Sequence, residues 1–324
     1  MRFFVLILLS WSISASAFDI IAHRGLPRIY PEHTIQSLNA ALKWKPDYVE
    51  PDVVLSKDSI PVVLHDTHID TTTNVKQVFP LRKRSDGRYY AIDFTLKELK
   101  SLKVNHRINL KTGKSAFASR PLEKSPQNSI PSLKEFLDTV SRFNREQEKK
   151  IGVYPEIKAP AFHLKEGKDS VKIVHDLLLS FRSMDKDTEV ILQCFDFNAI
   201  KRLSKELKTP FFLVQLVAEN SWGESTTDYD KLKKMAGLKE LKKYAQGLGP
   251  WIPQIMNKEG KPSQFLKEAQ KLGFKIHPYT LRNDALPFNM KSEQYLLHIL
   301  KNKLKVDGIF TDNVNTIVPL MKDL

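Results

Sequence analysis

The stretch that organises this chain is Tyr48-Val-Glu-Pro-Asp-Val-Val-Leu-Ser-Lys-Asp-Ser-Ile-Pro-Val-Val-Leu-His-Asp66. It contains two β-branched runs, residues 49–55 and 60–65, joined by a polar turn at residues 56–59. This turn is too short for a parallel crossover, which needs about a dozen residues or more. The sequence therefore predicts an antiparallel β-hairpin.

The register of this hairpin decides which side chains share a face. A turn centred on residues 57–58 places Glu50 opposite His65, and Asp52 then lies opposite Val63. Opposed residues project from the same face, as do residues two apart on one strand. The predicted face of two carboxylates and an imidazole suits a hard cation beside a general acid or base. The alternative is the solvated polar face of an ordinary amphipathic hairpin.

The composition describes a globular chain with a leader. A length of 324 residues allows one large domain or two smaller ones, and 41% hydrophobic content with 18 Phe indicates a substantial core. Residues 1–17 combine Arg2, an apolar run and the small-residue site Ala15-Ser-Ala17, which is typical of a secretory signal peptide cleaved before Phe18. No second long apolar run follows, so we expect the mature chain, residues 18–324, to be soluble, without stable membrane insertion.

Cysteine usage and charge narrow the compartment and the ligands. Cys194 is the only cysteine, so no internal disulfide is expected, and the cleavage site lacks the cysteine of a lipid anchor. In a bacterium the destination would be the periplasm or the medium, and we expect the periplasm. Removing Arg2 lowers the formal charge from +14 to +13, and this balance favours anionic ligands such as phosphates. A lysine-rich solvated surface explains most of these charges equally well. No nucleic-acid partner is expected, and the oligomeric state is left open.

Predicted strands and helices alternate along the chain. The first strand, residues 18–25, is followed by a helix from about residue 34 to 44. Later strands are predicted at 151–158, 189–196, 211–217, 246–249, 275–280 and 308–312, with helices at about 131–149, 170–181, 198–206, 263–272 and 291–303. This pattern predicts an α/β fold, an irregular (β/α)8 TIM barrel in which the hairpin breaks the alternation. Residues 67–128, with a short helix at 95–102, are predicted to form a small inserted subdomain after the third strand that covers the mouth of the site.

Polar side chains end the predicted strands, where a parallel barrel places its active site. Glu50, Asp52 and Glu156 offer oxygen ligands, which suit Ca²⁺ or Mg²⁺ and not zinc. Pro51 lies between two of these carboxylates and lacks an N–H, so we expect a bulge or a sheet edge there.

Histidines and cations accompany the carboxylates. His23 and His65 would share acid and base roles, since an imidazole can accept or donate a proton near neutral pH. Arg24 and Lys158 would neutralise a phosphate. Each residue taken alone is more often structural, but their recurrence at successive strand ends indicates one site.

The chain resembles the periplasmic glycerophosphodiester phosphodiesterases of bacteria over essentially the whole mature sequence. The matching motifs are Ile21-Ala-His-Arg-Gly25, Tyr30-Pro-Glu-His-Thr34, Val49-Glu-Pro-Asp52, Val62-Val-Leu-His-Asp66, Gly87-Arg-Tyr-Tyr-Ala-Ile-Asp-Phe-Thr95, Tyr154-Pro-Glu-Ile-Lys158, Leu192-Gln-Cys-Phe-Asp196, His277-Pro-Tyr-Thr280 and Gly308-Ile-Phe-Thr-Asp312. The segment from residue 219 to 241 is matched only loosely.

The resemblance implies a metal-dependent hydrolase that converts deacylated phospholipids, such as glycerophosphocholine and glycerophosphoethanolamine, to sn-glycerol 3-phosphate and an alcohol. It implies Ca²⁺ as the usual ion of the secreted branch. The expected site comprises the acid/base pair His23 and His65, the metal ligands Glu50, Asp52 and Glu156, and the phosphate and substrate contacts Arg24, Lys158, Gln193, Phe195 and Tyr279.

Two other functions remain open at this point. A related barrel phospholipase acting on intact lipids would need an exposed apolar rim, and the sequence shows no such loop. A surface adhesin or binding protein on the same fold would be expected to carry a lipid-anchor cysteine or to have lost catalytic residues, and neither is seen.

Overall fold

Short strands form the wall of a closed barrel in the computed structural model, which describes residues 18–120 and 128–322. The predicted leader, residues 1–17, lies outside the described residues, as do residues 121–127 of the predicted insertion. The strands are β1 (Asp19–His23), β2 (Tyr48–Glu50), β3 (Asp52–Leu55), β4 (Pro61–Val63), β5 (Gly152–Val153), β6 (Glu156–Ile157), β7 (Ile191–Cys194), β8 (Phe212–Val217), β9 (Gly247–Pro250), β10 (Lys275–Ile276) and β11 (Gly308–Thr311).

The strands pair in two sheets, ordered β11-β1-β2-β5 and β10-β9-β8-β7-β6-β3-β4. Backbone bonds join the sheets at both ends: Glu156 N donates to Pro51 O at 2.9 Å, and Phe310 N donates to Pro278 O at 3.0 Å. Every ladder between these strands is parallel except that between β3 and β4. The wall therefore closes as an irregular (β/α)8 barrel with β4 as an additional antiparallel strand, which confirms the predicted fold class.

Two of the predicted strands are each divided at a proline. The run at residues 49–55 separates at Pro51 into β2 and β3, and the run at residues 151–158 separates before Pro155 into β5 and β6. Proline cannot donate to a ladder, so each strand is interrupted there, although the carbonyls of Pro51 and Pro155 still accept backbone bonds from Glu156 N and Gln193 N. Pro51 lies at neither the bulge nor the sheet edge that its missing N–H suggested, because its carbonyl still accepts a bond from β6.

The hairpin forms as predicted, but its predicted register is wrong by one residue. Val53 pairs with Val63 in the β3–β4 ladder, whereas Asp52 had been expected opposite Val63. Glu50 lies on β2, outside this ladder, so the predicted opposition of Glu50 and His65 does not exist.

The turn of the hairpin explains the shift. Ser56 Oγ accepts a bond from Ile60 N at 2.9 Å and donates to Asp58 Oδ1 at 2.6 Å. Ser59 has φ of 61°, the left-handed conformation that ends a three-residue hairpin loop. These interactions centre the loop on Asp58 and lengthen it by one residue relative to a loop centred between residues 57 and 58.

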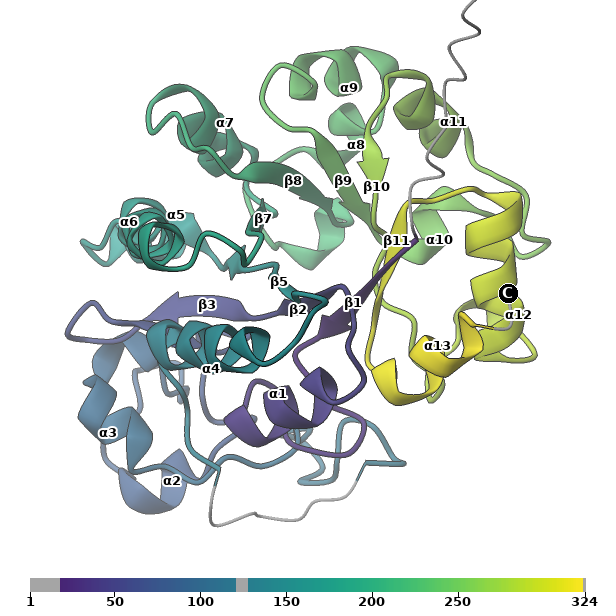
Figure 1. The fold of residues 1–324 in the computed structure, drawn as a ribbon. Helices are drawn as coiled ribbons and strands as arrows, with labels where there is room; N and C mark the ends of the chain where they lie inside the picture. Colours follow the sequence, from purple (N-terminus) through teal and green to yellow (C-terminus); the bar gives the residue numbers. More distant parts are fainter. Residues whose placement is uncertain (1–17, 121–127, 323–324) are drawn as a thin grey trace, which may run out of the picture.

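Helices surround the strands (Figure 1). They are α1 (Ile35–Leu42), α4 (Leu133–Arg145), α5 (Pro160–Lys165), α6 (Ser170–Met184), α7 (Phe197–Lys205), α8 (Tyr229–Leu232), α9 (Met235–Leu241), α10 (Ile252–Ile255), α11 (Gln264–Lys271), α12 (Glu293–His298), which runs on into a π-helical turn (Ile299–Lys303), and α13 (Val314–Leu320). Helices occur in each region where the sequence predicted one. The sequence analysis missed α5, α10 and α13.

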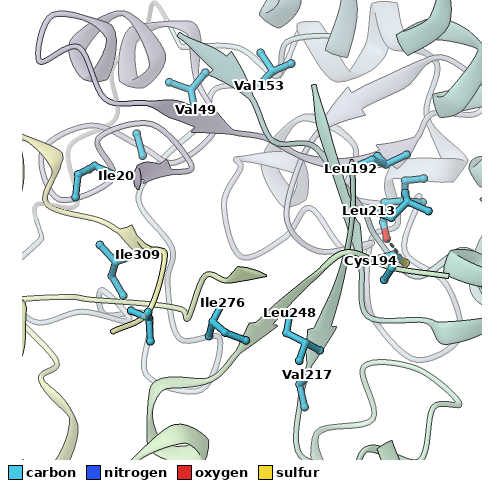
Figure 2. Close-up of a cluster of buried hydrophobic side chains, with 14 of the residues drawn as sticks. Ile20, Val49, Val153, Leu192, Cys194, Leu213, Val217, Leu248, Ile276 and Ile309 are labelled. Carbon is cyan, nitrogen blue, oxygen red and sulfur yellow. Dashed lines mark hydrogen bonds between the residues drawn. The ribbon is translucent and has the colours of Figure 1, made fainter. Parts of the chain in front are cut away.

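Alternation along the strands builds two apolar layers. One set packs outward against the helices, and Figure 2 shows members of this set, among them Ile20, Val49, Leu192 and Ile309. Cys194 belongs to this layer and is fully buried. The opposite set forms its own cluster inside the barrel: Ile21, Tyr48, Tyr154, Ile191, Val214 and Phe310. The barrel is thus filled below the level of its strand ends.

The insertion has its own small core. It contains α2 (Val75–Val78), a 3₁₀ turn (Ala91–Asp93) and α3 (Leu96–Lys100), which begins at the predicted Thr95 with a reciprocal capping box to Glu98. Buried side chains from these elements pack with Val54, Val62 and Leu64 of the hairpin region. In Figure 1 α2 and α3 lie outside the helix ring, beyond β3 and α4.

Loss of packing in the outward layer should be costly. Leu192→Ala, at a fully buried position, is expected to lower the free energy of unfolding by about 2–5 kcal/mol, since it leaves a cavity between β7 and the helices. Leu164→Ala, at a position 64% exposed on α5, should change it by no more than about 0.5 kcal/mol. Urea unfolding of both variants checks this, and equal effects would contradict the assigned core.

Candidate active site

The polar site lies one level above the apolar filling of the barrel. Its residues follow the inward-facing apolar residues at a spacing of two: His23 follows Ile21, Glu50 follows Tyr48, and the same spacing gives Glu156, Gln193 and Asp312. Strand pairing sets their height. His23 pairs with Glu50 across β1 and β2, while Asp52 pairs with Glu156, which in turn pairs with Gln193. The parallel register therefore gathers these side chains at one end of the barrel.

Three carboxylates converge in this layer. Glu50, Asp52 and Glu156 are buried and each offers an oxygen within 4.8 Å of the others. Burial raises the pKa of Glu50 well above its usual range, and neighbouring Asp52 raises it further. Burial likewise raises the pKa of Glu156. The buried Asp52 Oδ1 has no hydrogen-bond partner among the described residues. Crowded oxygens with a free buried acceptor fit a hard divalent cation.

His23 is oriented by a carboxylate. Its Nδ1 lies 2.6 Å from Asp312 Oδ1, which leaves Nε2 as the ring nitrogen available to a ligand in the cavity that His23 lines. Burial lowers the pKa of His23 to about 4, with Arg24 contributing and Asp312 opposing. The imidazole is therefore neutral at pH 7 in the free protein.

His65 reaches the same cavity after the chain leaves β4. Its Nδ1 contacts Asp66 Oδ1, and Asp66 Oδ2 in turn contacts Arg107 Nη1. Burial, followed by the positive charges of Arg24 and Lys158, lowers the pKa of His65 to about 3. The second histidine thus has the same arrangement as the first, with Nδ1 held by a carboxylate and Nε2 left for a ligand.

Arg24 is held against the carboxylates by its backbone conformation. Its φ of 58° is unusual for a residue with a side chain. In this conformation its N–H donates to Glu50 Oε2 at 3.0 Å and its Nε lies 3.2 Å from Asp52 Oδ2. Gly25 follows with φ of 89°, and a Cβ there would lie 2.6 Å from Ser37 Oγ. Only glycine fits this turn, which delivers Arg24 to the site.

Lys158 adds a second cation. Its buried Nζ lies 2.8 Å from Glu156 Oε1 and 3.6 Å from Glu224 Oε2. Burial lowers the pKa of Lys158, but Glu156 and Asp52 outweigh this and hold it above its usual range. Lys158 is therefore charged when it faces a ligand.

His23, Arg24, Glu50, His65 and Glu156 border a cavity of about 600 Å³. Asp52 and Lys158 lie behind this lining, in contact with Arg24 and Glu156. The predicted substrate contacts Gln193, Phe195 and Tyr279 all line it. Gln193 Nε2 donates to Glu50 Oε1 at 3.3 Å, so it also positions a carboxylate. Tyr279 Oη donates to Val217 O at 2.8 Å, so its ring forms part of the wall. His277, also at a strand end, is not among the lining residues. Its Nδ1 is hydrogen-bonded to Tyr154 Oη at 3.2 Å.

Sequence reasoning missed several residues around the cavity. Arg107 and Phe117 come from the insertion, and Trp222 and Glu224 come from the loosely matched segment, facing Trp251. The indole ring centroids of Trp222 and Trp251 lie 5.1 Å apart, and the two rings meet edge to face. The periodicity of the sequence does not mark Arg107, Phe117, Trp222 or Glu224, because these residues lie outside the strands and not at strand ends.

Comparison with known proteins agrees with this geometry. The sequence profile of the glycerophosphoryl diester phosphodiesterase family matches residues 23–316. The chain belongs to this family. The glycerophosphodiester phosphodiesterase of Haemophilus influenzae is 38% identical, over 94% of this chain and 90% of its own. That of Treponema pallidum is 32% identical, over 92% and 90%. The chain is therefore an enzyme of this class, a phosphoric diester hydrolase.

Solved glycerophosphodiester phosphodiesterase structures share the fold. A phosphodiesterase from Oleispira antarctica, in complex with the product sn-glycerol 3-phosphate, superimposes with a TM-score of 0.62 at 20% identity, over 94% of this chain and 96% of its own. The enzyme from Agrobacterium tumefaciens gives a TM-score of 0.60 at 19% identity, over 93% and 99%.

The helices were also compared with the length of a membrane span. Among residues 18–120 and 128–322, no helix is both long enough and apolar enough to cross a bilayer.

Crowding of the three carboxylates should destabilise the metal-free protein. Because the folded-state pKa of Glu50 is raised, the folded state binds more protons than the unfolded one, and stability falls as pH rises through that pKa. In chelator at pH 8, Glu50→Gln should therefore raise the free energy of unfolding by about 1–2 kcal/mol.

Asp312→Asn is the matched control for this prediction. Burial raises the pKa of Asp312, but Arg282, His23 and Arg120 outweigh it and hold the pKa well below its usual range. Removing this paired charge should lower stability under the same conditions. Urea unfolding in chelator measures the free energy of unfolding of both variants. A lower value for Glu50→Gln than for the wild type would argue against repulsion within the carboxylate triad, Glu50, Asp52 and Glu156.

Proposed function

We propose that the chain hydrolyses glycerophosphodiesters, the deacylated forms of phospholipids, to sn-glycerol 3-phosphate and an alcohol, and that the reaction depends on a divalent cation. The observation that carries this proposal is the placement of two carboxylate-oriented histidines, His23 and His65, in one cavity with the buried carboxylate triad. The names of the relatives and the product in the Oleispira antarctica structure support the substrate class.

Glu50, Asp52 and Glu156 would hold the cation. Ca²⁺ is proposed because the ligands are all carboxylate oxygens, and Mg²⁺ is the alternative. When bound, such an ion polarises a phosphoryl oxygen and lowers the pKa of a hydroxyl or water beside it. Its charge would also allow all three carboxylates to ionise together.

His23 and His65 would move the protons. The Nε2 atom of one takes a proton from the attacking hydroxyl or water, and that of the other gives a proton to the departing alcohol oxygen. Both imidazoles are neutral in the free protein, as the base requires. The negative phosphate of a bound substrate raises the pKa of an adjacent imidazole, which favours the acid form of the other.

Arg24 and Lys158 would hold the phosphate. Each contacts a different carboxylate, Arg24 with its Nε 3.2 Å from Asp52 Oδ2 and the buried Lys158 with its Nζ 2.8 Å from Glu156 Oε1. Their fixed charges oppose the repulsion between the phosphate and those carboxylates, and they stabilise the charge that develops on the phosphoryl oxygens.

The far wall of the cavity fits a cationic alcohol such as choline or ethanolamine. Trp222 and Trp251 present aromatic faces, and Glu224 is the remaining carboxylate in the lining outside the triad. Aromatic faces and a negative charge together attract an ammonium group.

Export is part of the proposal. The leader pattern at residues 1–17 supports delivery to the periplasm. Deacylated phospholipids that reach that compartment would then be the substrates within reach.

The proposal predicts release of sn-glycerol 3-phosphate from glycerophosphocholine by the purified mature protein with Ca²⁺, and none with excess chelator. Glu50→Gln should lower both metal affinity and activity by on the order of 10–100-fold. His65→Ala should lower turnover by on the order of 10²–10⁴-fold while metal still binds.

An enzyme-coupled assay of sn-glycerol 3-phosphate, with calorimetry for metal binding, separates the outcomes. Full activity in either variant would refute the assigned site. Activity on intact lipid alone would indicate the phospholipase alternative, and no activity from folded protein would indicate a binding protein.

The aromatic wall should discriminate between headgroups. Trp222→Leu keeps apolar bulk but removes the ring face, so kcat/KM on glycerophosphocholine should fall about 2- to 30-fold. Activity on glycerophosphoglycerol, which carries no ammonium group, should change little.

The matched control is Trp44→Leu, since Trp44 is 40% exposed and Trp222 43% exposed, and Trp44 is not among the cavity-lining residues. It should leave both substrates unaffected. Equal losses on the two substrates in Trp222→Leu would mean that the wall contributes bulk alone.

A further inference from the structure

Arg107 of the insertion completes a chain of contacts to His65. Its Nη1 contacts Asp66 Oδ2, and Asp66 Oδ1 contacts His65 Nδ1. The other side of the guanidinium is fixed as well, because Arg107 Nη2 lies 2.7 Å from the buried Glu32 Oε1. Among the described residues, the Asp66 side chain also accepts a long hydrogen bond from Thr71 Oγ1, at 3.5 Å. The orientation of Asp66 therefore depends mainly on Arg107.

Arg120, also from the insertion, completes the corresponding chain to His23. Its Nη2 lies 2.6 Å from Asp312 Oδ2, and Asp312 Oδ1 lies 2.6 Å from His23 Nδ1. Arg120 is buried and its Nε is 3.0 Å from Asp284 Oδ2. Asp312 has a second support in Arg282, whose Nε lies 3.0 Å from the same Oδ2.

The two series of contacts, Arg107–Asp66–His65 and Arg120–Asp312–His23, have the same arrangement. In each, a carboxylate uses Oδ1 for an imidazole Nδ1 and Oδ2 for an arginine, and in each that arginine comes from the insertion at residues 67–128. Charge-assisted bonds of this kind are among the strongest hydrogen bonds in proteins and fix geometry as well as charge. A carboxylate held at both oxygens cannot rotate away from the imidazole.

We propose that the insertion acts as a positioning element for both histidines, with Arg107 and Arg120 as the positioning residues. The inference rests on the acid/base roles proposed above for His23 and His65. It assigns to the insertion a function in turnover, beyond covering the mouth of the cavity. Outer partners that orient a reacting group through a first carboxylate commonly affect activity strongly.

The arrangement predicts unequal contributions. Asp66 loses its main support when Arg107 is removed, whereas Asp312 keeps Arg282 when Arg120 is removed. Arg107→Ala should therefore lower kcat by on the order of 10–100-fold, and Arg120→Ala by less. KM should change less than kcat in either variant, because Asp66 and Asp312 carry the effect of each arginine to a histidine. A small rise in KM is expected in Arg107→Ala alone, since Arg107 lines the cavity and shares Glu32 with Arg24.

The control is Arg84→Ala, another arginine of the insertion. Arg84 pairs with Asp93 at 2.7 Å and with Glu166 of α5 at 2.8 Å, and it is not among the residues lining the cavity. It should retain wild-type kcat even if its melting temperature falls. An equal loss of kcat in Arg84→Ala would mean that the insertion matters only through its general stability, which would overturn the proposal.

Two further readouts separate positioning from other roles. Added guanidinium, at concentrations that leave the melting temperature unchanged, should restore part of the kcat of Arg107→Ala. Asp66→Asn combined with Arg107→Ala should cost little more than either change alone, because both break the same chain. A raised KM with unchanged kcat in Arg107→Ala would instead make Arg107 a phosphate contact and refute the positioning role.

His23→Ala and His65→Ala, assayed in parallel, distinguish failure of the inference from failure of the proposed function. If both histidine variants are inactive while Arg107→Ala and Arg120→Ala turn over like the wild type, the positioning role fails and the proposed function survives. If the histidine variants are fully active, the proposed function itself fails.

Discussion

Electrostatic crowding in the triad is the constraint on which the rest of this structure depends. Three buried carboxylates lie within 4.8 Å of one another at the end of the barrel, in surroundings that raise the pKa of two of them. Like charges this close are tolerated only where cations are supplied. The protein supplies Arg24 and Lys158 from two sides, and a divalent ion is the remaining cation that the geometry admits.

The fold brings the carboxylates together through strand register. Glu50 and Asp52 both reach the interior from one chain segment because they flank Pro51, where pairing passes from one sheet to the other. Glu156 enters at the same height because it pairs with Asp52 across a parallel ladder. A helix cannot place carboxylates this way, since residues two apart on a helix face different directions. The parallel strand register of the barrel is therefore what aligns the carboxylates in this site.

Much of this could be read from the sequence, for a specific reason. Polar residues at strand ends can be recognised from the sequence, because the alternation of side chains along a strand shows which residues face the barrel interior. Parallel strands then bring these residues together at one end of the barrel. The histidines, the three carboxylates, Arg24 and Lys158 were all predicted in this way. The structure gathers them at one end of the barrel, with Asp52 and Lys158 in contact with residues that line the cavity. The hairpin register was wrong by one residue because it depended on how the Ser56 side chain closes the turn, which strand patterning does not encode.

The outer contacts could not be predicted in the same way. Arg107 and Arg120 reach Asp66 and Asp312 from a segment that has its own core and its own path. Their partners are 41 and 192 residues away in sequence, and no periodicity links such positions. Trp222 raises the same difficulty, because it belongs to the connection between β8 and α8. Trp251 does not, because it directly follows β9 and pairs with Tyr279, so it is a strand-end residue that the sequence reasoning passed over. Tertiary packing determines which residues contact a catalytic side chain from outside. The position of that side chain itself follows from its place at the end of a strand.

The measurement that tests this account most directly is calorimetric titration of the mature protein with Ca²⁺, alongside Asp52→Asn, which removes one carboxylate charge from the triad. The account predicts one ion bound per chain in the wild type and loss of that binding in the variant. Equal stoichiometry and affinity in the two proteins would show that the ion binds elsewhere, and would contradict the assignment of the triad as the centre of the site.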